Sequence, residues 1–341
     1  MRNDLYPTDN ENKGSITPQV LTLSSYEVEG LLSMSEALEA VENAFKLEVE
    51  AEAIMPPKLY LDLPEYHGDF RAMPAYINGS AGLKWVSVYP DNERHNFPCV
   101  IATIVLCDPN TGCLLAVMDG TYITSMRTGA AGGVAVKYLA RRDSSSIGII
   151  GTGTQARTQL LAISEVLPRI EEVKVFDLRR DASQRFAEEM GAKLNINIRP
   201  VETIEQATEA DIVVTATPST TPIVKKQYIR PGTHINAIGA DAKGKQELEA
   251  DVLKNAKVVV DSIEQASHSG EINVPLSQGM IRVEEIYGTL GEVVANMKRG
   301  RENDEEITIF DSTGLAIQDI VCAKLVYNKA KERGHGRLEF L

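Results

Sequence analysis

The spacing of hydrophobic and polar positions changes twice along this chain of 341 residues. Residues 1–16 are polar and carry proline, asparagine and glycine, which is typical of a loose tail. Over residues 33–53 apolar side chains recur every three or four positions. This predicts an amphipathic helix with Ser33 or Ser35 as its N-cap. The segment MPPK ends this helix, because proline cannot continue it.

Residues 59–117 change to short apolar runs separated by turn residues, which is typical of strands. The segment CDPNTGC is the clearest hairpin turn between two of them. We therefore expect a mainly antiparallel sheet with one or two flanking helices. The runs that predict strands are KLYLDL, DFRAMPAYI, AGLKWVSVYP, CVIATIVLCD and LLAVMDG.

From about residue 121 the pattern alternates between helix and strand, beginning with the small-residue helix YITSMRTGAAGGVAVKYLA. Regular alternation predicts a parallel sheet with helices on both faces, and short β-branched strands suit burial on both sides. The last helix, AIQDIVCAKLVYNKAKE, lies beyond these strands, so we expect it to pack back on the first region. The strands are SIGIIG, EVKVFD, ADIVVTAT, THINAIG, KVVVDS and ITIFDSTG.

These patterns predict an α/β protein of two domains, which the length allows. The first domain combines residues 17–126 with residues 319–341 in a mainly antiparallel α+β arrangement. The second is a Rossmann-type doubly wound parallel sheet over residues 127–318.

Composition narrows the class of partner. The chain has 35 basic and 48 acidic residues, a formal charge of −13, which repels phosphate backbones and anionic lipid and argues against nucleic acid or membrane partners. The N-terminus has no apolar signal-peptide core and no run of 18 apolar residues occurs, so we expect a cytoplasmic protein. The four cysteines lack metal-binding spacing and are interpreted as reduced thiols.

The segment SIGIIGTGTQA is a strand that leads into a GxGxxA turn, with Gly151, Gly153 and Ala156 at the special positions. The first glycine permits the tight turn, the second lets the backbone approach a pyrophosphate, and the small third residue lets helix and strand pack closely. The pyrophosphate would lie on free N–H groups at the helix N-terminus. This motif predicts a dinucleotide site.

Asp177 ends the next strand, EVKVFD, where a carboxylate accepts both ribose hydroxyls and repels the 2′-phosphate of NADP. Arg179 and Arg180 follow and weaken this discrimination, although solvated loop charges explain them as well. We therefore predict NAD as the cofactor.

The chain resembles the ornithine cyclodeaminase/μ-crystallin family, and within it the archaeal-type alanine dehydrogenase branch, from about residue 18 to about residue 330. The motifs that carry the resemblance are MPPKLYL, DFRAMPAY, GLKWVSVYP, LLAVMDGTYITSMRTGAAGG, GIIGTGTQA, THINAIGADAKGKQEL, GEINVP and ITIFDSTGLAIQD. They are specific for the family and much less specific for the reaction.

The resemblance implies a homodimer, an active site between the domains, and a first domain that binds substrate and forms the dimer. It implies that Lys84 and Arg127 hold a substrate carboxylate with help from Lys58 and Arg71, and that Asp241 is the catalytic acid/base, with Lys84 as a second catalytic residue. Positions that contact the cofactor are Gly151, Gly153, Thr154, Gln155, Ala156, Asp177, Thr217, Lys245 and Ser312.

These residue types suit the oxidation of an α-amino acid, in which hydride leaves Cα for the nicotinamide and water hydrolyses the resulting iminium. Fixed cations are needed to aim Cα–H at the ring, and arginine and lysine supply them. Lys84 and Arg127 lie among apolar or small neighbours, where a charge is costly unless it is used. Asp241 follows the strand ending NAIG, at the carboxyl edge of the sheet, and can accept a proton or activate water.

Other candidates for the catalytic base, and for a metal site or a nucleophile, have weaker support in the sequence. His234 lies within a strand and is interpreted as a packed histidine, whereas His268 and Glu271 are placed on a loop near the nicotinamide and are not expected to be the base. The histidines lack HExxH or HxxxH spacing and no GxSxG occurs, so neither a metal nor a serine nucleophile is predicted.

Three reactions remain open. The first is an NAD-dependent dehydrogenase that converts L-alanine reversibly to pyruvate and ammonia. The second is ornithine cyclodeaminase, which forms L-proline and ammonia with catalytic NAD, and the third is a cyclic-imine (ketimine) reductase or a μ-crystallin-like binding protein. Cyclodeaminases of the family carry an acid where this chain has Arg71 and arginine where it has Lys58, and Arg71 would repel a second ammonium. The μ-crystallin branch typically lacks the aspartate at position 241, so Asp241 favours an enzyme.

Overall fold

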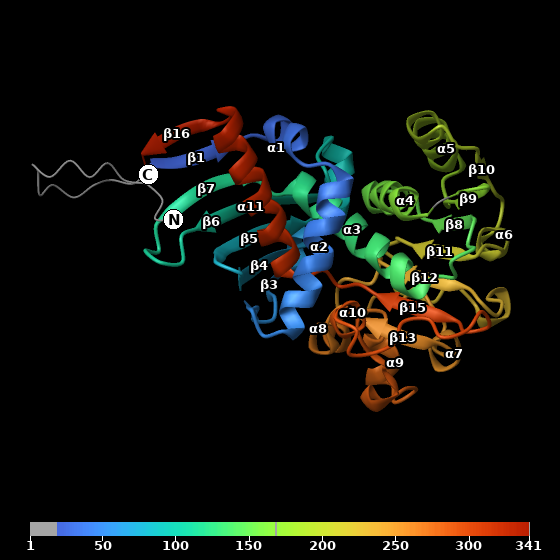
Figure 1. Cartoon of the computed structure of the whole chain (residues 1–341). Helices are drawn as coiled ribbons and strands as arrows, with labels where there is room; N and C mark the ends of the chain where they lie inside the picture. Colours follow the sequence, from blue (N-terminus) through green and yellow to red (C-terminus); the bar gives the residue numbers. More distant parts are fainter. Residues whose placement is uncertain (1–18, 168, 341) are drawn as a thin grey trace, which may run out of the picture.

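A computed structural model describes residues 19–167 and 169–340, and the predicted tail (1–16) lies outside them. Two eight-stranded sheets organise the described residues. Helix α3 (Thr121–Leu139) runs between them, as Figure 1 shows. This arrangement confirms the predicted fold class of a parallel α/β sheet with a second α+β unit. The domain limits at residues 126 and 318 remain a prediction.

The first sheet is mainly antiparallel, as predicted, and the hairpin between β6 and β7 turns at CDPNTGC. One strand pair, β1 with β7, is parallel. The sequence analysis assigned no strand to the segments that form β1 and β16. The order is β16 (Arg337–Phe340), β1 (Gln19–Leu23), β7 (Leu114–Asp119), β6 (Val100–Cys107), β5 (Ser80–Val88), β4 (Gly68–Ile77) and β2 (Ala53–Ile54), and β3 (Leu59–Leu63) also pairs with β4.

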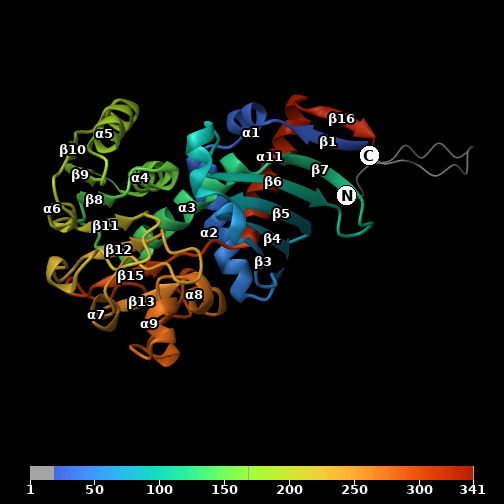
Figure 2. The ribbon, with the colours of Figure 1, turned by 180° about the vertical axis from the view of Figure 1, so that it is seen from behind.

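Helices α1 (Ser25–Leu31), α2 (Met34–Val49) and α11 (Ala316–Arg333) complete this part of the molecule. The side chain of Ser33 caps α2 together with Glu36, and α2 ends four residues earlier than predicted. Helix α11 packs on strands β4, β5 and β6, which confirms that the C-terminal helix returns to the first sheet. In the view from behind, these strands lie in front and α11 lies beyond them (Figure 2).

The second sheet is wholly parallel and contains every strand that the alternating pattern predicts. Its order is β10 (Ile198–Pro200), β9 (Glu172–Phe176), β8 (Ser146–Ile150), β11 (Ile212–Thr215), β12 (His234–Ala237), β15 (Thr308–Asp311), β13 (Lys257–Val260) and β14 (Gly288–Thr289). The order reverses direction at β8, the point where doubly wound sheets bind ligands outside the carboxyl ends of the strands.

Helices cover both faces of the parallel sheet and enclose two separate hydrophobic clusters. Helices α4 (Thr154–Val166) and α5 (Arg180–Leu194) pack with α3 on one face. Side chains of α6 (Ile204–Thr208), α7 (Ala250–Lys254) and α8 (Ile263–Ser269) belong to the cluster on the other. Two short helices, α9 (Asn273–Ser277) and α10 (Leu290–Val294), follow α8 in the chain.

The small residues of α3 explain its central position. A methyl group at Gly129 or Gly132 would collide with Thr158 or Gln159 of α4, so only glycine allows the two helices to approach so closely. Helix α3 therefore ties the dinucleotide motif at the start of α4 to the residues that follow β7. Since α3 also contacts β6 of the first sheet and β12 of the second, it links the two sheets.

Candidate active site

A cavity of about 110 Å³ lies between the two sheets. Its polar lining comes from both sides of the molecule and includes seven of the residues predicted from the sequence. Its apolar lining is Met73, Val86, Val88, Val100 and Ile238. The predicted residues that line it are Lys58, Arg71, Lys84, Arg127, Gln155, Asp241 and Ser312.

Two of the cations that line the cavity, Arg71 and Lys84, lie on strands of the antiparallel sheet. Arg71 and Met73 are two residues apart on β4. In the strand register Arg71 lies opposite Val86 of β5, and Met73 lies opposite Lys84. Residues two apart on a strand share one face, so both cations project from the face that borders the cavity. Lys84 is 1% exposed and Arg71 is 5% exposed. Both charges are thus held almost entirely out of water.

Lys84 and Arg127 share one carboxylate. The Nζ atom of Lys84 lies 2.7 Å from Oδ2 of Asp319, and Nε of Arg127 donates to Oδ1 of Asp319 at 2.9 Å. Asp319 lies in the first turn of α11 and is fully buried. Burial and the neighbouring Arg127 lower the pKa of Lys84 to about 7, although Asp319 opposes this shift. The sequence analysis did not identify Asp319, because an acid in a helical first turn is usually a solvated residue.

Arg71 joins the two sides of the cavity. Its Nε and Nη2 atoms donate to Asp69 at 2.6 and 3.2 Å, and Nη1 donates to Oδ2 of Asp241 at 2.9 Å and to its main-chain oxygen at 3.2 Å. The guanidinium also lies over the ring of Tyr60 at 5.2 Å from its centroid. All three nitrogen atoms of Arg71 therefore have partners within the protein.

Asp241 follows β12 at the carboxyl edge of the parallel sheet and pairs with Arg71 and, at 2.5 Å, with Lys245. Burial would raise the pKa of this carboxyl group, but Arg71 and Lys245 outweigh burial and hold the pKa well below its usual range. In this arrangement Asp241 is ionised and a weak base. Lys245, which is predicted to contact the cofactor, pairs with Asp241 and does not line the cavity.

Lys58 precedes β3 and donates to the main-chain oxygen of Thr313. Burial and the charge of Arg71 lower its pKa to about 8. Thr313 and Gly314 in turn donate their N–H groups to buried Asp261, each at 2.6 Å. The chain between β15 and α11 therefore forms one wall of the cavity and fixes the position of Lys58.

The glycine-rich turn has the geometry that a dinucleotide requires. Gly151 has φ +93°, and a side chain there would strike the oxygen of Ala216. A Cβ atom on exposed Gly153 would meet nothing within 4 Å, so the space next to it is open to a ligand. Helix α4 begins at Thr154 and its first-turn N–H groups have no intrahelical acceptors. Ala156 is fully buried where helix and strand pack.

Asp177 lies beside this turn. Its Oδ2 accepts from the N–H and the hydroxyl of Thr152 at 3.1 and 2.6 Å, and its Oδ1 accepts from the N–H of Arg179 at 2.9 Å. The next residue, Leu178, is 94% exposed. Thr152 and Leu178 are absent from the sequence predictions, because neither residue type carries a signal of its own.

Two buried polar atoms at predicted cofactor positions lack partners within the described residues, Oε1 of Gln155 and Oγ of Ser312. An unpaired buried polar atom is costly, and a ligand that donates to it removes that cost. Thr217 instead donates through N–H and hydroxyl to Glu247, and its methyl group packs near Gly151. The residues at the motif therefore fit a dinucleotide.

Fully buried acids support the loops at the carboxyl edge of the parallel sheet. Glu271 accepts N–H bonds from Glu247 and Leu248, and Asp311 accepts them from Glu271 and Ile272. Burial and the charge of Glu247 raise the pKa of Glu271 well above its usual value, and burial raises that of Asp311 to about 8. These acids hold main chain in place and do not line the cavity.

His234 and His268 are consistent with the interpretation that neither is the base. Buried His234 bonds to Thr308 and Asn236, both at 2.9 Å, and burial lowers its pKa to about 3. The loop placement of His268 was wrong, because this residue lies in α8, where helical hydrogen bonding continues to Ser269. Its ring faces that of Tyr60 at 5.8 Å between centroids.

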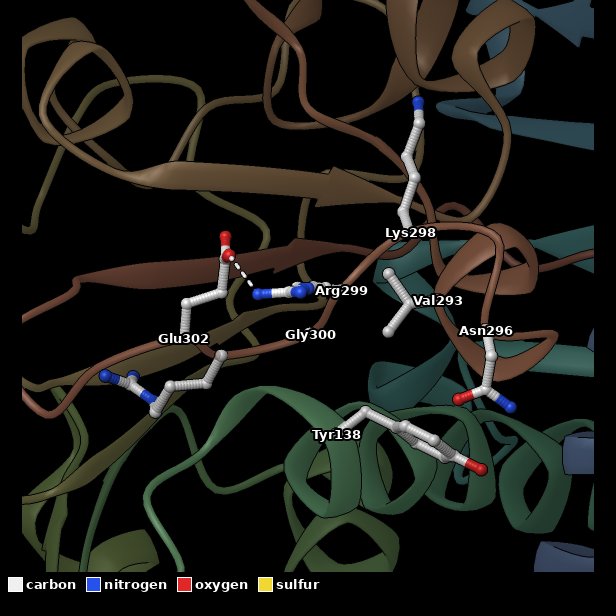
Figure 3. Close-up of a pocket in the computed structure, with 8 residues that line it drawn as sticks. Tyr138, Val293, Asn296, Lys298, Arg299, Gly300 and Glu302 are labelled. Carbon is white, nitrogen blue, oxygen red and sulfur yellow. Dashed lines mark ion pairs between the residues drawn. The ribbon is translucent and has the colours of Figure 1, made fainter.

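A larger hollow of about 540 Å³ lies between the end of α3 and the segment 296–302. Figure 3 shows Tyr138 on one side and Arg299 directed towards Glu302, with 3.7 Å between their charged atoms. Lys298 points away and pairs with Glu292 at 3.0 Å. No residue of the dinucleotide motif lines this hollow, so it is not the candidate site.

Within residues 19–167 and 169–340, no three His, Cys, Asp or Glu side chains are grouped so that they could hold a metal ion. Over the same ranges, no helix is both long and apolar enough to cross a membrane.

A family model and a known protein sequence both match nearly the whole chain. The model of the ornithine cyclodeaminase/mu-crystallin family matches residues 19–334. An alanine dehydrogenase of Archaeoglobus fulgidus is 53% identical over 321 residues, which are 93% of this chain and 97% of that protein.

Two solved structures have the same fold over nearly the whole chain. One is an archaeal alanine dehydrogenase dimer with bound NAD, with a TM-score of 0.91 and 52% identity over 95% of this chain and 100% of that one. The other is Delta(1)-pyrroline-2-carboxylate reductase of Thermococcus litoralis with NADH and L-proline, with a TM-score of 0.91 and 45% identity over 93% and 99% of the two chains.

Proposed function

This chain belongs to the ornithine cyclodeaminase/mu-crystallin family, and we propose that it is an NAD-dependent alanine dehydrogenase. The reaction converts L-alanine, NAD⁺ and water to pyruvate, ammonium, NADH and a proton, and it is reversible. The observation that carries the proposal is the small cavity where four cations and Asp241 meet, beside a turn that fits a dinucleotide. Its small volume of about 110 Å³ suits a substrate of few atoms.

Arg127 and Lys84 bind the substrate carboxylate in this proposal. Among the described residues, Nη1 of Arg127 has only Gln318 as a partner, at 3.4 Å, and Nη2 has none, so both atoms are available to a carboxylate. Cations held by a buried framework lose little entropy when they bind, which is how fixed positioning accelerates a reaction. The carboxylate fixed in this way directs Cα–H towards the nicotinamide.

The cofactor would lie along the turn at Gly151 and Gly153, with its pyrophosphate on the N-terminus of α4 and its ribose on Asp177. Gln155 and Ser312, whose polar atoms lack partners, lie where that molecule would reach the cavity. When bound, NAD accepts the hydride. Relatives with solved structures bind NAD or NADH, and Asp177 supports NAD over NADP here.

Asp241 accepts the proton that the substrate ammonium must lose before hydride transfer, and it later activates water. Its ion pair with Arg71 must first be exchanged, because that pair keeps its pKa low. A substrate carboxylate that reaches Arg71 would compete with Asp241 for Nη1 and so raise the basicity of Asp241. Substrate binding and activation of the base are thereby linked.

A homodimer forms through the uncovered face of the first sheet in this proposal. Leu59 and Leu61 of β3, Trp85 of β5 and Ile101 of β6 are large apolar side chains with 40% to 63% of their surface exposed. Exposed apolar residues that cluster on a sheet mark an interaction surface. A relative at 52% identity is a dimer in its solved structure.

The test is an assay with purified protein, NAD and either L-alanine or L-ornithine, in which NADH absorbance and ammonia are followed together. Equal amounts of NADH and ammonia from alanine are expected. Ammonia and proline from ornithine without net NADH would replace the proposal with cyclodeaminase, although Arg71 opposes a second ammonium in the cavity.

One observation favours a second candidate, a reductase of small cyclic imines. Five aliphatic side chains line the cavity, more than the methyl group of alanine needs, and they could hold a five-membered ring. A relative at 45% identity is Delta(1)-pyrroline-2-carboxylate reductase. Oxidation of NADH by Δ1-pyrroline-2-carboxylate, with no activity on alanine, would establish this alternative.

A further inference from the structure

A buried carboxylate without a role in the proposed chemistry lies directly behind the two carboxylate-binding cations. Asp319 is fully buried, does not line the cavity, and contacts Lys84 and Arg127 with one oxygen each. Its partners come from β5 and α3, whereas Asp319 itself belongs to α11. The ion pairs of Asp319 therefore connect three elements of the fold, β5, α3 and α11.

The charges of this group explain why an acid is needed there. Two cations that are nearly withdrawn from water repel each other and are costly to bury, whereas one anion between them removes most of that cost. Lys84, Arg127 and Asp319 together carry a charge of +1. One substrate carboxylate brings the sum to zero, so the group is matched to a monocarboxylate.

Asp319 orients Arg127 in addition to balancing its charge. Asp319 accepts a hydrogen bond from Nε of Arg127 at 2.9 Å, which fixes the plane of the guanidinium and leaves its outer nitrogen atoms free of this acid. Gln318, the preceding residue, is the 3.4 Å partner of Nη1. An arginine without this support would have several rotamers to lose when a ligand binds.

We propose that Asp319 is a positioning residue that orients Arg127 and keeps Lys84 charged for binding of the substrate carboxylate. This inference rests on the proposed function, because it assumes that a carboxylate binds in the cavity. Asp319 itself touches neither substrate nor cofactor in this arrangement.

The charged surroundings of Lys84 give the inference a pH signature. Arg127 from α3 and Lys58 from the segment before β3 disfavour its charged form, and Asp319 from α11 favours it. Cys322, one turn along α11, is neutral because burial raises its pKa to about 12. Loss of the Asp319 charge therefore lowers the pKa of Lys84 further below about 7.

Simple attraction and positioning predict opposite results for Asp319→Asn. Removal of an anion near a carboxylate site should tighten carboxylate binding if only the net charge mattered. The positioning role predicts weaker binding, because Lys84 becomes neutral and Arg127 loses its fixed plane. A role confined to folding predicts unchanged binding in any protein that folds.

The experiment titrates pyruvate into the protein–NADH complex without ammonia, by isothermal calorimetry from pH 5.5 to pH 9. The wild-type dissociation constant should rise as the pH passes about 7. In D319N it should be at least tenfold higher at pH 6.5, and the pH at which binding weakens should move to lower values. Asp251→Asn, an exposed aspartate of α7, is the matched control and should bind as wild type.

A folded D319N variant with equal or tighter binding overturns the inference. If D319N does not fold, Lys84→Met is compared with the double variant K84M/D319N, which restores the net charge to +1. Weaker binding in the double variant supports positioning, and equal or tighter binding overturns it. A wild-type protein that binds no pyruvate overturns the proposed function, and the inference falls with it.

Discussion

Replacement of Asp241 by asparagine tests the centre of the proposed chemistry. Asparagine keeps the size and the hydrogen-bonding oxygen of the side chain but cannot accept the proton of the substrate ammonium. Asp241 pairs with Arg71 at 2.9 Å and with Lys245 at 2.5 Å, and 30% of its side chain is exposed. A carboxylate so placed can exchange partners without unfolding its surroundings.

The expected loss follows from the role assigned to the residue. A positioned general base contributes about 10²-fold to 10⁴-fold to a rate, so kcat for alanine oxidation should fall by that factor. This corresponds to about 3 to 5 kcal/mol of activation free energy, at about 1.36 kcal/mol for each factor of ten. The free energy of unfolding should fall by less than this, about 1 to 3 kcal/mol, because buried Arg71 loses one charged partner but keeps its two bonds to Asp69.

The assay is steady-state NADH formation from L-alanine at saturating NAD, with a separate titration of NADH by fluorescence. NADH should bind D241N and the wild type equally, which separates loss of chemistry from loss of the cofactor site. A kcat within tenfold of the wild type, with a raised KM for alanine, would refute the reasoning. Asp241 would then serve only to hold Arg71.

Three further predictions use other parts of the structure. Because only the charged form of Lys84 attracts a carboxylate and its pKa is about 7, KM for pyruvate should rise as the pH passes from 6 to 8, measured in NADH-dependent amination. Asp177→Ser should improve kcat/KM for NADP relative to NAD at least tenfold, because the carboxylate that repels a 2′-phosphate is gone. Phe310→Ala should lower the free energy of unfolding in urea by about 3 to 5 kcal/mol, since this fully buried ring packs edge-on against Phe45, whereas exposed Phe97→Ala should change it little.

The sequence predicted much of the fold because its patterns are local. Six strands of the parallel sheet are short apolar runs, and each of the six forms as predicted, whereas the short strands β10 and β14 were not predicted. The edge strand β16 and its neighbour β1 were not predicted, because pairing between segments more than 300 residues apart leaves no local periodicity. The helix limit at Val49 differed for a related reason, since the residues beyond it pair with β4 from Ala53 onwards.

The candidate site was predicted as a set of residues and not as a set of contacts. Motif position identified the cations and Asp241, and the structure places five of these residues around one cavity. Asp69 and Asp319, which pair with these cations, and Thr152, which donates to Asp177, were missed, because an acid or a threonine has no distinctive surroundings in the sequence. Which carboxylate neutralises which cation depends on packing between elements far apart in the chain, and the pKa values of the site follow from those pairs.

The segment between β15 and α11 connects the cofactor side of the site with the ion pairs of the substrate-binding cations. β15 belongs to the parallel sheet that would hold the cofactor, and α11 packs on the antiparallel sheet that carries Arg71 and Lys84. The residues that connect them contact Lys58 through Thr313, and the first turn of α11 then supplies Asp319. A change in the distance between the sheets would therefore alter the surroundings of Lys58, Lys84 and Arg127 together. Helix α3 contacts both sheets and packs closely on α4 through its glycines, so this packing opposes such a change.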